Sequence, residues 1–151
     1  NLFKNKSYTC GDLMFLIEMY RLKYPKNPCS SFDPTSNIIN NKEEISDCIA
    51  QYLKIGETRW KNGRLTQYIL SENNIKGQYP TGANYATELN YLDISKNEFW
   101  GSFPTSLCDI ESKGTLRIAG NKFCPPYPDC FNNNAIIQID LEDMKEEAIC
   151  D

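Results

Sequence analysis

The sequence contains no histidine, an absence that bears on both catalysis and metal binding. Histidine is the side chain that most often acts as a general base near neutral pH and as a metal ligand. The chain also lacks a Cys-x-x-Cys pair, a glycine-rich phosphate-binding loop and a Gly-x-Ser-x-Gly elbow. We therefore expect a protein that is not an enzyme and that uses no metal ion and no cofactor.

Long apolar runs are missing too, since no stretch reaches the roughly 18 residues of a membrane-spanning helix. Positive charge is scarce, because 16 Lys and Arg stand against 20 Asp and Glu, for a net charge of -4. Proteins that bind nucleic acid by neutralising phosphates need the opposite balance. The chain opens on Asn1 with neither Met nor an apolar leader, as a mature or trimmed product would. We expect no membrane span and no nucleic-acid partner.

Cysteine, by contrast, is abundant, with 7 residues in 151. In a chain this short, and without zinc-type spacing, that number indicates disulfides and an oxidising compartment. We therefore expect a secreted or extracellular-surface glycoprotein, with Asn5 in its N-glycosylation triplet. The cysteines form two groups, one being Cys10, Cys29 and Cys48 and the other Cys108, Cys124, Cys130 and Cys150.

Spacing alone leaves the pairing open, because four C-terminal cysteines allow three connectivities. Cys48 lies on an apolar helical stripe, which favours it as a buried free thiol. The pairing that we expect first is Cys10–Cys29, Cys124–Cys130 and Cys108–Cys150.

Two helices are predicted in the first 60 residues. Asp12 offers an N-cap for the first helix, whose apolar residues recur at helical spacing until the chain approaches Pro25. The second helix begins near Asn41 and carries its own apolar stripe. Neither helix can bury its apolar face alone, so we interpret residues 1–60 as an N-terminal helical cap. Trp60 is expected in the core between this cap and the segment that follows.

A sequence repeat follows the cap and is clearest in the stretch Leu89–Pro104. An asparagine recurs every 24 residues, and a proline follows each one at a constant distance. The pattern Leu-x-x-Leu-x-Leu-x-x-Asn at a fixed period of this size is typical of leucine-rich repeats. The recurring residues are Asn73, Asn97 and Asn121, with Pro80, Pro104 and Pro128.

Each repeat is expected to contribute one short strand, along which alternate side chains point into the core and outward. The asparagine should turn the chain after the strand, with its amide bonded to backbone groups that the bend leaves free. The predicted core residues are Tyr68, Leu70, Leu92, Ile94, Leu116 and Ile118, followed past the turns by Ile75, Phe99 and Phe123.

The chain after the repeats is rich in proline and in acidic residues. Three prolines between Cys124 and Cys130 should end the stack. The alternating stretch Ala135–Leu141 is predicted as one more strand, which either completes the stack or forms an arm of a C-terminal cap. The acidic tail that follows, Glu142–Asp151, is expected to be a solvated end of the molecule.

The motif after each asparagine narrows the resemblance. Gly77–Pro80 (Gly-Gln-Tyr-Pro) and Gly101–Pro104 (Gly-Ser-Phe-Pro) are similar to the plant-specific class of leucine-rich repeats. That class is found in plant receptor ectodomains, in polygalacturonase-inhibiting proteins and in some protist surface and cyst-wall proteins. The resemblance covers residues 60–130, and the Asn-, Lys- and Ile-rich composition suits the AT-rich genome of a protist.

The resemblance implies a fold of the α/β solenoid class. We expect a short, curved stack of about three 24-residue leucine-rich repeats, with a helical N-terminal cap and a disulfide-rich C-terminal cap. The expected divisions are residues 1–60 for the first cap, 61–131 for the repeats, and 132–151 for the second cap and tail.

In this family the ligand usually contacts the variable side chains of the strand face. Tyr91 is favoured because a rigid aromatic side chain loses little entropy on binding. Asp93 and Arg117 fall on adjacent strands, where they form either a surface ion pair or part of the site. Trp100 is expected to face solvent beside Lys76, free to stack on a sugar or a partner, or to pack on the proline-rich loop. The candidate binding residues are Gln67, Ile69, Tyr91, Asp93, Ser95, Arg117 and Trp100.

Three functions remain open. The first is an extracellular recognition module that engages a protein or peptide partner through the concave strand face. The second is a structural surface-coat or cyst-wall-like protein that binds polysaccharide or assembles with copies of itself. The third, implied by the inhibitor branch of the resemblance, is an inhibitor of a secreted glycan-degrading enzyme. Retention on insoluble polysaccharide distinguishes the second function from the first.

Overall fold

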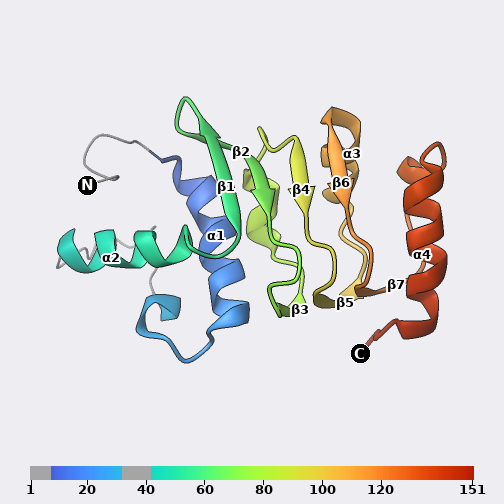
Figure 1. The fold of residues 1–151 in the computed structure, drawn as a ribbon, viewed down its shortest axis with the longest axis horizontal. Helices are drawn as coiled ribbons and strands as arrows, with labels where there is room; N and C mark the ends of the chain where they lie inside the picture. Colours follow the sequence, from blue (N-terminus) through green and yellow to red (C-terminus); the bar gives the residue numbers. More distant parts are fainter. Residues whose placement is uncertain (1–7, 32–41) are drawn as a thin grey trace.

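The computed structural model describes residues 8–31 and 42–151, so the expected glycosylation site at Asn5 lies outside the described residues. Two helices lie at the N-terminal end, a row of strands in the middle and one helix at the C-terminal end (Figure 1). The helices are α1 (Cys10–Lys23), α2 (Lys42–Tyr52), α3 (Leu107–Lys113) and α4 (Ala135–Glu147), with the 3₁₀ helices η1 (Pro28–Ser31), η2 (Thr81–Tyr85) and η3 (Asp129–Phe131). The strands are β1 (Glu57–Lys61), β2 (Arg64–Ile69), β3 (Lys76–Gln78), β4 (Tyr91–Asp93), β5 (Glu98–Ser102), β6 (Thr115–Arg117) and β7 (Lys122–Cys124).

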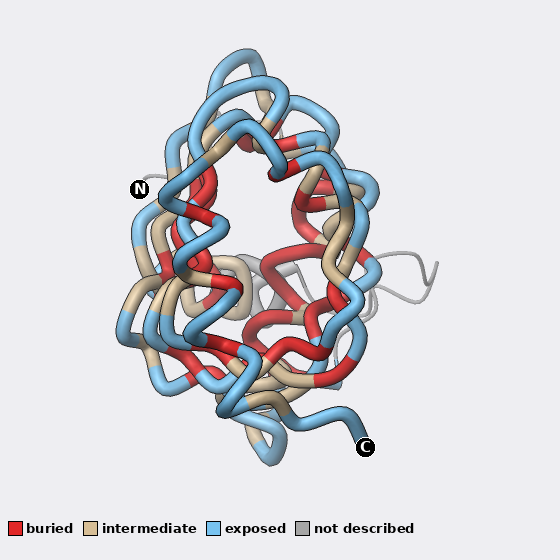
Figure 2. Tube along the Cα trace, turned by 90° about the vertical axis from the view of Figure 1, so that its right-hand side faces the viewer, coloured by how far each residue is buried: buried red, intermediate tan, exposed pale blue. Residues whose placement is uncertain are grey.

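The strands form two sheets, with the orders β1-β2-β4-β6 and β3-β5-β7. β1 pairs antiparallel with β2, whereas each of the other described pairs is parallel. Gln67 lies opposite Tyr91 and Tyr91 opposite Thr115, so the register of the larger sheet advances by the 24 residues of the sequence repeat. Viewed along this row, successive turns of the chain lie behind one another (Figure 2).

The core of the strand row matches the prediction from the repeat. The six inward strand residues are at most 5% exposed, and so are Ile75, Phe99 and Phe123 beyond the turns. The rings of Phe99 and Phe123 lie parallel, with their centroids 6.0 Å apart. Burial of this apolar column, at about 25 cal/mol per Å² of apolar surface, is the main force that holds successive turns together.

The repeating asparagines form the ladder that the sequence predicts. Asn97 is buried and joins two turns of the chain through both atoms of its amide, and Asn121 does the same one strand further on. Asn73 has no asparagine on the turn before it, and its Oδ1 accepts from Nζ of Lys23 in α1 at 3.2 Å. The groups bonded to Asn97 are the N–H of Asn73 (3.1 Å) and Ile75 (3.1 Å) and the C=O of Leu70 (2.9 Å), Ile94 (3.0 Å) and Ser95 (3.2 Å).

Helix α1 covers the first end of the row and packs against η2 and β3. The prediction that Asp12 caps this helix is wrong, because the helix already begins at Cys10. The Asp12 carboxylate is fully buried instead, where it accepts from Nε of Arg64 at 2.8 Å and from the N–H of Leu65 at 3.0 Å. Asp12 therefore ties α1 to β2.

Trp60 lies on β1 and is half-buried, packed against the core as expected. Its ring centroid is 4.7 Å from that of Tyr8, in an edge-on arrangement. The antiparallel pair of β1 and β2 crosses residue 60, where the first expected boundary falls. The division of the chain into a cap, repeats and a second cap stays a prediction.

The stretch predicted as a final strand is helical. Helix α4 stands beside β6 at the end of the row (Figure 1). Its buried residues Ile137, Leu141 and Met144 recur at helical spacing and close the end of the core. The Oδ1 atom of Asn134 caps the helix by accepting from the N–H of Ile137 at 3.1 Å. The strand prediction is wrong because the apolar residues of this stretch fit both periods, and the helical period continues to Met144.

Three disulfides join the described cysteines, in a pairing that corrects the expected one. Cys10 is the free and exposed thiol, and Cys48 is bonded. Cys10 begins α1 whereas η1 follows its other end, so about 20 Å of helix separates Cys10 from Cys29. The observed bonds are Cys29–Cys48, Cys108–Cys130 and Cys124–Cys150, with Cα–Cα distances of 5.3, 5.7 and 5.4 Å.

The C-terminal bonds follow from packing that the spacing does not reveal. Helix α3 lies against η3, which brings Cys108 to Cys130. Helix α4 leads the chain back to β7, which brings Cys150 to Cys124.

We predict the outcome of a non-reducing peptide map. Alkylation of the native protein should label Cys10, because its thiol is exposed and the other six cysteines are bonded. Digestion without reductant should then release three linked peptide pairs with the observed connectivity. Label on Cys48, or a peptide that links Cys10 to Cys29, would contradict this pairing.

Because several tyrosines are buried, we predict that the folded protein loses stability at alkaline pH. The hydroxyls of Tyr68 and Tyr79 are buried without a hydrogen-bond partner among the described residues. Burial raises the pKa of both above 10.0 and is the main reason that the pKa of Tyr52 rises to about 12. The folded chain therefore retains protons that the unfolded chain loses above pH 10.0, so stability is full below that pH and falls above it.

Urea unfolding at stepped pH between 9 and about 12 checks this expectation. The free energy of unfolding of the natural chain should decline steadily above about pH 10. Tyr68→Phe should make the decline shallower and leave stability at pH 7 unchanged or raised, because the hydroxyl that it removes has no partner. An equal decline in both proteins would contradict a contribution of Tyr68 to the loss of stability at alkaline pH.

Candidate functional site on the strand face

The outward side chains of the larger sheet form one surface, which we call the strand face. Alternation along a strand places them opposite the core residues. The register aligns them in two rows across the sheet, as the 24-residue repeat predicts. The rows are Gln67, Tyr91 and Thr115, and Ile69, Asp93 and Arg117.

The expected ion pair between Asp93 and Arg117 is not made. The two residues are opposite one another in the register, and Arg117 is exposed. Asp93, however, is only 8% exposed, and its Oδ1 accepts from the N–H of Ser95 at 3.0 Å and from its Oγ at 2.5 Å. No ion pair joins Asp93 to Arg117 in the described part of the chain, since the carboxylate is turned toward Ser95. Arg117 is thus available to a ligand, whereas Asp93 and Ser95 are hydrogen-bonded to each other.

Tyr91 is half-buried at the middle of its row, flanked by Gln67 and Thr115. An exposed ion pair borders the face at the turns that follow the strands, where Nζ of Lys96 lies 2.9 Å from Oε1 of Glu72. The hydrogen bond between them lowers the pKa of Glu72 and raises that of Lys96. The face therefore offers an aromatic centre and a partly charged border.

A hollow of about 490 Å³ opens where the strand face ends, between β6 and α4. We call it the strand-end hollow. Ser95, Lys96 and Arg117 line it from the strand side, and Ile136 and Asp140 from α4. Ile136 is 74% exposed, and burial, followed by the charge of Asp143, raises the pKa of Asp140.

Sequence reasoning missed the α4 side of this hollow because residues 135–141 were expected to form a strand. A signal was present, since Ile137, Leu141 and Met144 are spaced as one helical face. Under that period Ile136 and Asp140 fall on a different face of the helix, which borders β6.

Trp100 is separate from the strand face. It lies on β5, in the smaller sheet, and is half-buried. Its partners in the register are Gln78 and Lys122, and not Lys76 as expected. The register of the smaller sheet advances by 22 residues per strand, two fewer than the sequence repeat, which displaces each partner by two positions.

The described residues contain no group of three or more His, Cys, Asp or Glu side chains that could hold a metal ion. Within the same residues, no helix combines the length and the apolar character needed to cross a bilayer. The absence of catalysis, metal and cofactor stays an expectation.

Comparison with known proteins places the fold. No protein-family model matches the chain. Receptor-like protein 31 of Arabidopsis thaliana is 32% identical over 80 residues, which are 52% of this chain and 9% of that protein. The chain therefore spans a small part of the length of the curated relative that it matches.

Two solved structures resemble the chain over most of its length. The BIR2 ectodomain from Arabidopsis thaliana has a TM-score of 0.52 at 20% identity, covering 83% of this chain and 62% of that one. PEPR1, in the structure of PEPR1-AtPEP1, has a TM-score of 0.54 at 15% identity, covering 82% of this chain and 16% of that one. The fold of this chain is the leucine-rich-repeat fold that both structures share.

Proposed function

We propose that the chain is an extracellular recognition module that binds a protein or peptide partner through a concave strand face on a short solenoid of leucine-rich repeats. The observation that carries this proposal is the pair of side-chain rows on β2, β4 and β6, which ends at the strand-end hollow. Short parallel strands hold these side chains at a spacing of about 4.8 Å. A partner therefore meets a surface that needs little reordering to bind.

The comparisons support a recognition role. The curated relative is a receptor-like protein, and one of the similar structures is that of PEPR1-AtPEP1. The three disulfides and the absence of histidine suit a secreted binding protein better than a cytosolic enzyme. A partner that lies along the face would contact Tyr91 at its centre and reach Arg117 beside the hollow.

A selection from random linear peptides displayed on phage tests the proposal. Peptides that bind the immobilised chain should lose at least about tenfold in affinity for a double variant, Tyr91→Ala with Arg117→Ala, since truncating an aromatic and an Arg contact removes binding energy. The matched control, Lys76→Ala with Trp100→Ala, makes the same kinds of change on the smaller sheet and should leave affinity unchanged. Selected peptides that bind both double variants equally well would exclude the strand face as the site.

The second candidate is a surface-coat protein that binds polysaccharide. The position of Trp100 favours it, since the ring is half-buried on β5 with the exposed Gln78 beside it in the register. Passage over insoluble chitin, cellulose and galactosamine polymer separates the two functions. Retention that Trp100→Ala abolishes would support the coat function, and passage of a monomer without retention would exclude it.

A further inference from the structure

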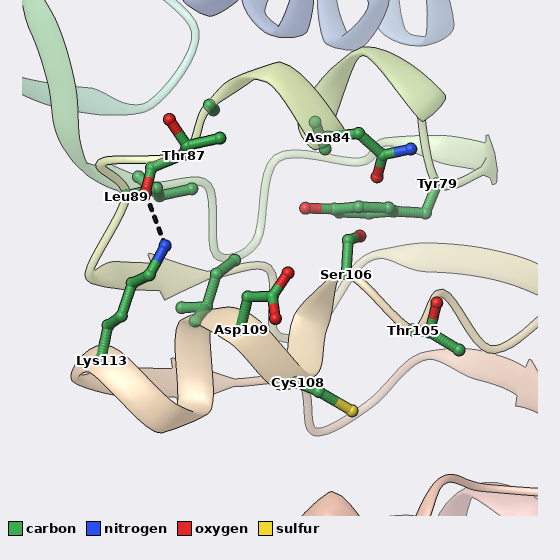
Figure 3. A pocket seen from close by; sticks show the side chains of 12 residues that line it. Tyr79, Asn84, Thr87, Leu89, Thr105, Ser106, Cys108, Asp109 and Lys113 are labelled. Carbon is green, nitrogen blue, oxygen red and sulfur yellow. Dashed lines mark hydrogen bonds between the residues drawn. The ribbon is translucent and has the colours of Figure 1, made fainter.

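A second hollow, of about 460 Å³, lies between η2 and α3, on elements that take no part in the strand face. We call it the helix-side hollow. Ala86, Leu89 and Ile110 give it an apolar lining, and Leu89 is only 1% exposed. Figure 3 shows this hollow from close by. One wall comes from the segment that contains η2 and the other from the segment that contains α3. Each of these segments connects a strand of the smaller sheet to the next strand of the larger sheet, and the hollow is the gap between them.

One polar group among the lining residues of this hollow has no partner in the described part of the chain. Tyr79 is 9% exposed, and its hydroxyl is fully buried without a hydrogen bond among the described residues. The rings of Phe15 and Phe99 hold Tyr79 edge-on, with centroids at 5.8 and 6.0 Å. In Figure 3 the hydroxyl points toward the space that the lining residues surround. A buried hydroxyl is normally hydrogen-bonded. A ligand atom in the hollow would supply the hydrogen-bond partner that the Tyr79 hydroxyl lacks.

Hydrogen-bonding side chains surround this hydroxyl. Asn84 lies on one side of the Tyr79 ring and Ser106 on the other, and the Asp109 carboxylate points into the same space (Figure 3). Asp109 makes no ion pair with a described residue, whereas Nζ of Lys113 already donates to the Thr87 carbonyl at 2.6 Å. The available groups are therefore an amide, hydroxyls, one carboxylate and the remaining N–H donors of the Lys113 ammonium.

We propose that the helix-side hollow binds a neutral saccharide unit. A pyranose ring presents C–H groups to apolar side chains and hydroxyl groups to polar ones, which matches a lining that holds both Leu89 and Ile110 and Asn84 and Asp109. The carboxylate accepts from sugar hydroxyls through charge-assisted bonds, and together with Lys113 it leaves the hollow without net charge, which suits a neutral ligand. The innermost sugar oxygen pairs with the hydroxyl of Tyr79 once the lining side chains that cover this hydroxyl shift aside. This site is independent of the proposed protein-binding face.

Titration of the ¹⁵N-labelled protein with methyl β-glucoside, methyl β-galactoside, N-acetylglucosamine and cellobiose tests the proposal. At least one of these sugars should shift the amide signals of Ser106, Asp109 and Ile110 saturably, with a dissociation constant of about 1–10 mM. Asp109→Asn and Tyr79→Phe should each weaken that affinity by about fivefold to tenfold, because Asp109→Asn replaces a charged acceptor by a neutral one and Tyr79→Phe removes one hydrogen bond to the ligand.

Tyr68→Phe is the matched control. Tyr68 also carries a buried hydroxyl without a partner, but it does not line the helix-side hollow, so sugar affinity should be unchanged. Tyr91→Ala should likewise have no effect, which separates this site from the strand face. No saturable shift with any of the four sugars would overturn the proposal. Equal weakening by Tyr68→Phe and Tyr79→Phe, or tighter binding of galacturonate than of methyl β-galactoside, would overturn it too.

Discussion

Replacing Asn97 by Ala should lower the free energy of unfolding by about 4 kcal/mol, a large part of the roughly 5–15 kcal/mol that stabilises an ordinary domain. The change leaves the N–H groups of Asn73 and Ile75 without acceptors in a buried turn. It also leaves the C=O groups of Leu70 and Ile94 without this donor. Each buried group left unpaired costs about 1–3 kcal/mol. Urea unfolding monitored by circular dichroism measures the loss.

Asn73→Ala is the matched control, since it truncates the same side chain at the first position of the ladder. There the amide is half-buried and bonds only to the Ser71 carbonyl and to Lys23 among the described residues. We expect a loss of about 1 kcal/mol. Similar losses for Asn97→Ala and Asn73→Ala would mean that the ladder does not stabilise neighbouring turns.

Replacing Arg64 by Ala should cost about 3 kcal/mol, because it leaves the Asp12 carboxylate buried without its countercharge. The N–H of Leu65 would remain as a partner of that carboxylate. Since Asp12 lies on α1 and Arg64 on β2, the loss should appear as weaker docking of the helix. Hydrogen exchange of the α1 amides should accelerate more than exchange in β4 and β6.

A second substitution tests the cause of this loss. Asp12→Asn in the Arg64→Ala background removes the unpaired charge while the amide oxygen still accepts from Leu65, so part of the stability should return. Lys96→Ala serves as the control, because its partner Glu72 is as exposed as Lys96 itself and the pair should contribute nothing measurable. Failure of Asp12→Asn to restore stability would exclude the buried charge as the cause.

The repeated part of the fold was predictable because three rules agree on it. The period of 24 residues, the inward Leu and Ile positions and the asparagine turns each point to parallel strands in register. The core positions and the amide bonds of Asn97 and Asn121 follow directly. The smaller sheet was less predictable, since its register depends on how the chain bends after each asparagine.

The structure of residues 132–151 was not predictable to the same degree. In residues 135–141 the apolar side chains fit a strand and a helix equally well, and tertiary packing against the open end of the core selects the helix. Disulfide pairing depends on that choice, because only the returning helix brings Cys150 to Cys124. The local sequence around Cys10 and Cys48 does not reveal which of the two is the free thiol and which is bonded.

The candidate site divides in the same way. Strand alternation and the register fix the rows that contain Gln67, Tyr91 and Arg117, whereas a ligand at these residues stays a prediction. The shielding of Asp93 by Ser95 depends on a rotamer, and no pattern in the sequence reveals it. Likewise, the free hydroxyl of Tyr79 is visible only when the walls of the helix-side hollow are assembled.

The asparagine ladder also determines where repeat units can be added to the chain or removed from it. Asn97 donates to the Leu70 carbonyl on the turn before it, and Asn121 donates to the Ile94 carbonyl in the equivalent place. An inserted copy of one 24-residue unit between them would find matching donors and acceptors on both sides. The two ends of the row offer no such continuation, because the antiparallel β1 and the helix α4 close them. Duplication or deletion of a unit, in evolution or by design, is therefore accommodated in the interior of the row, where it lengthens or shortens the strand face and leaves both ends intact.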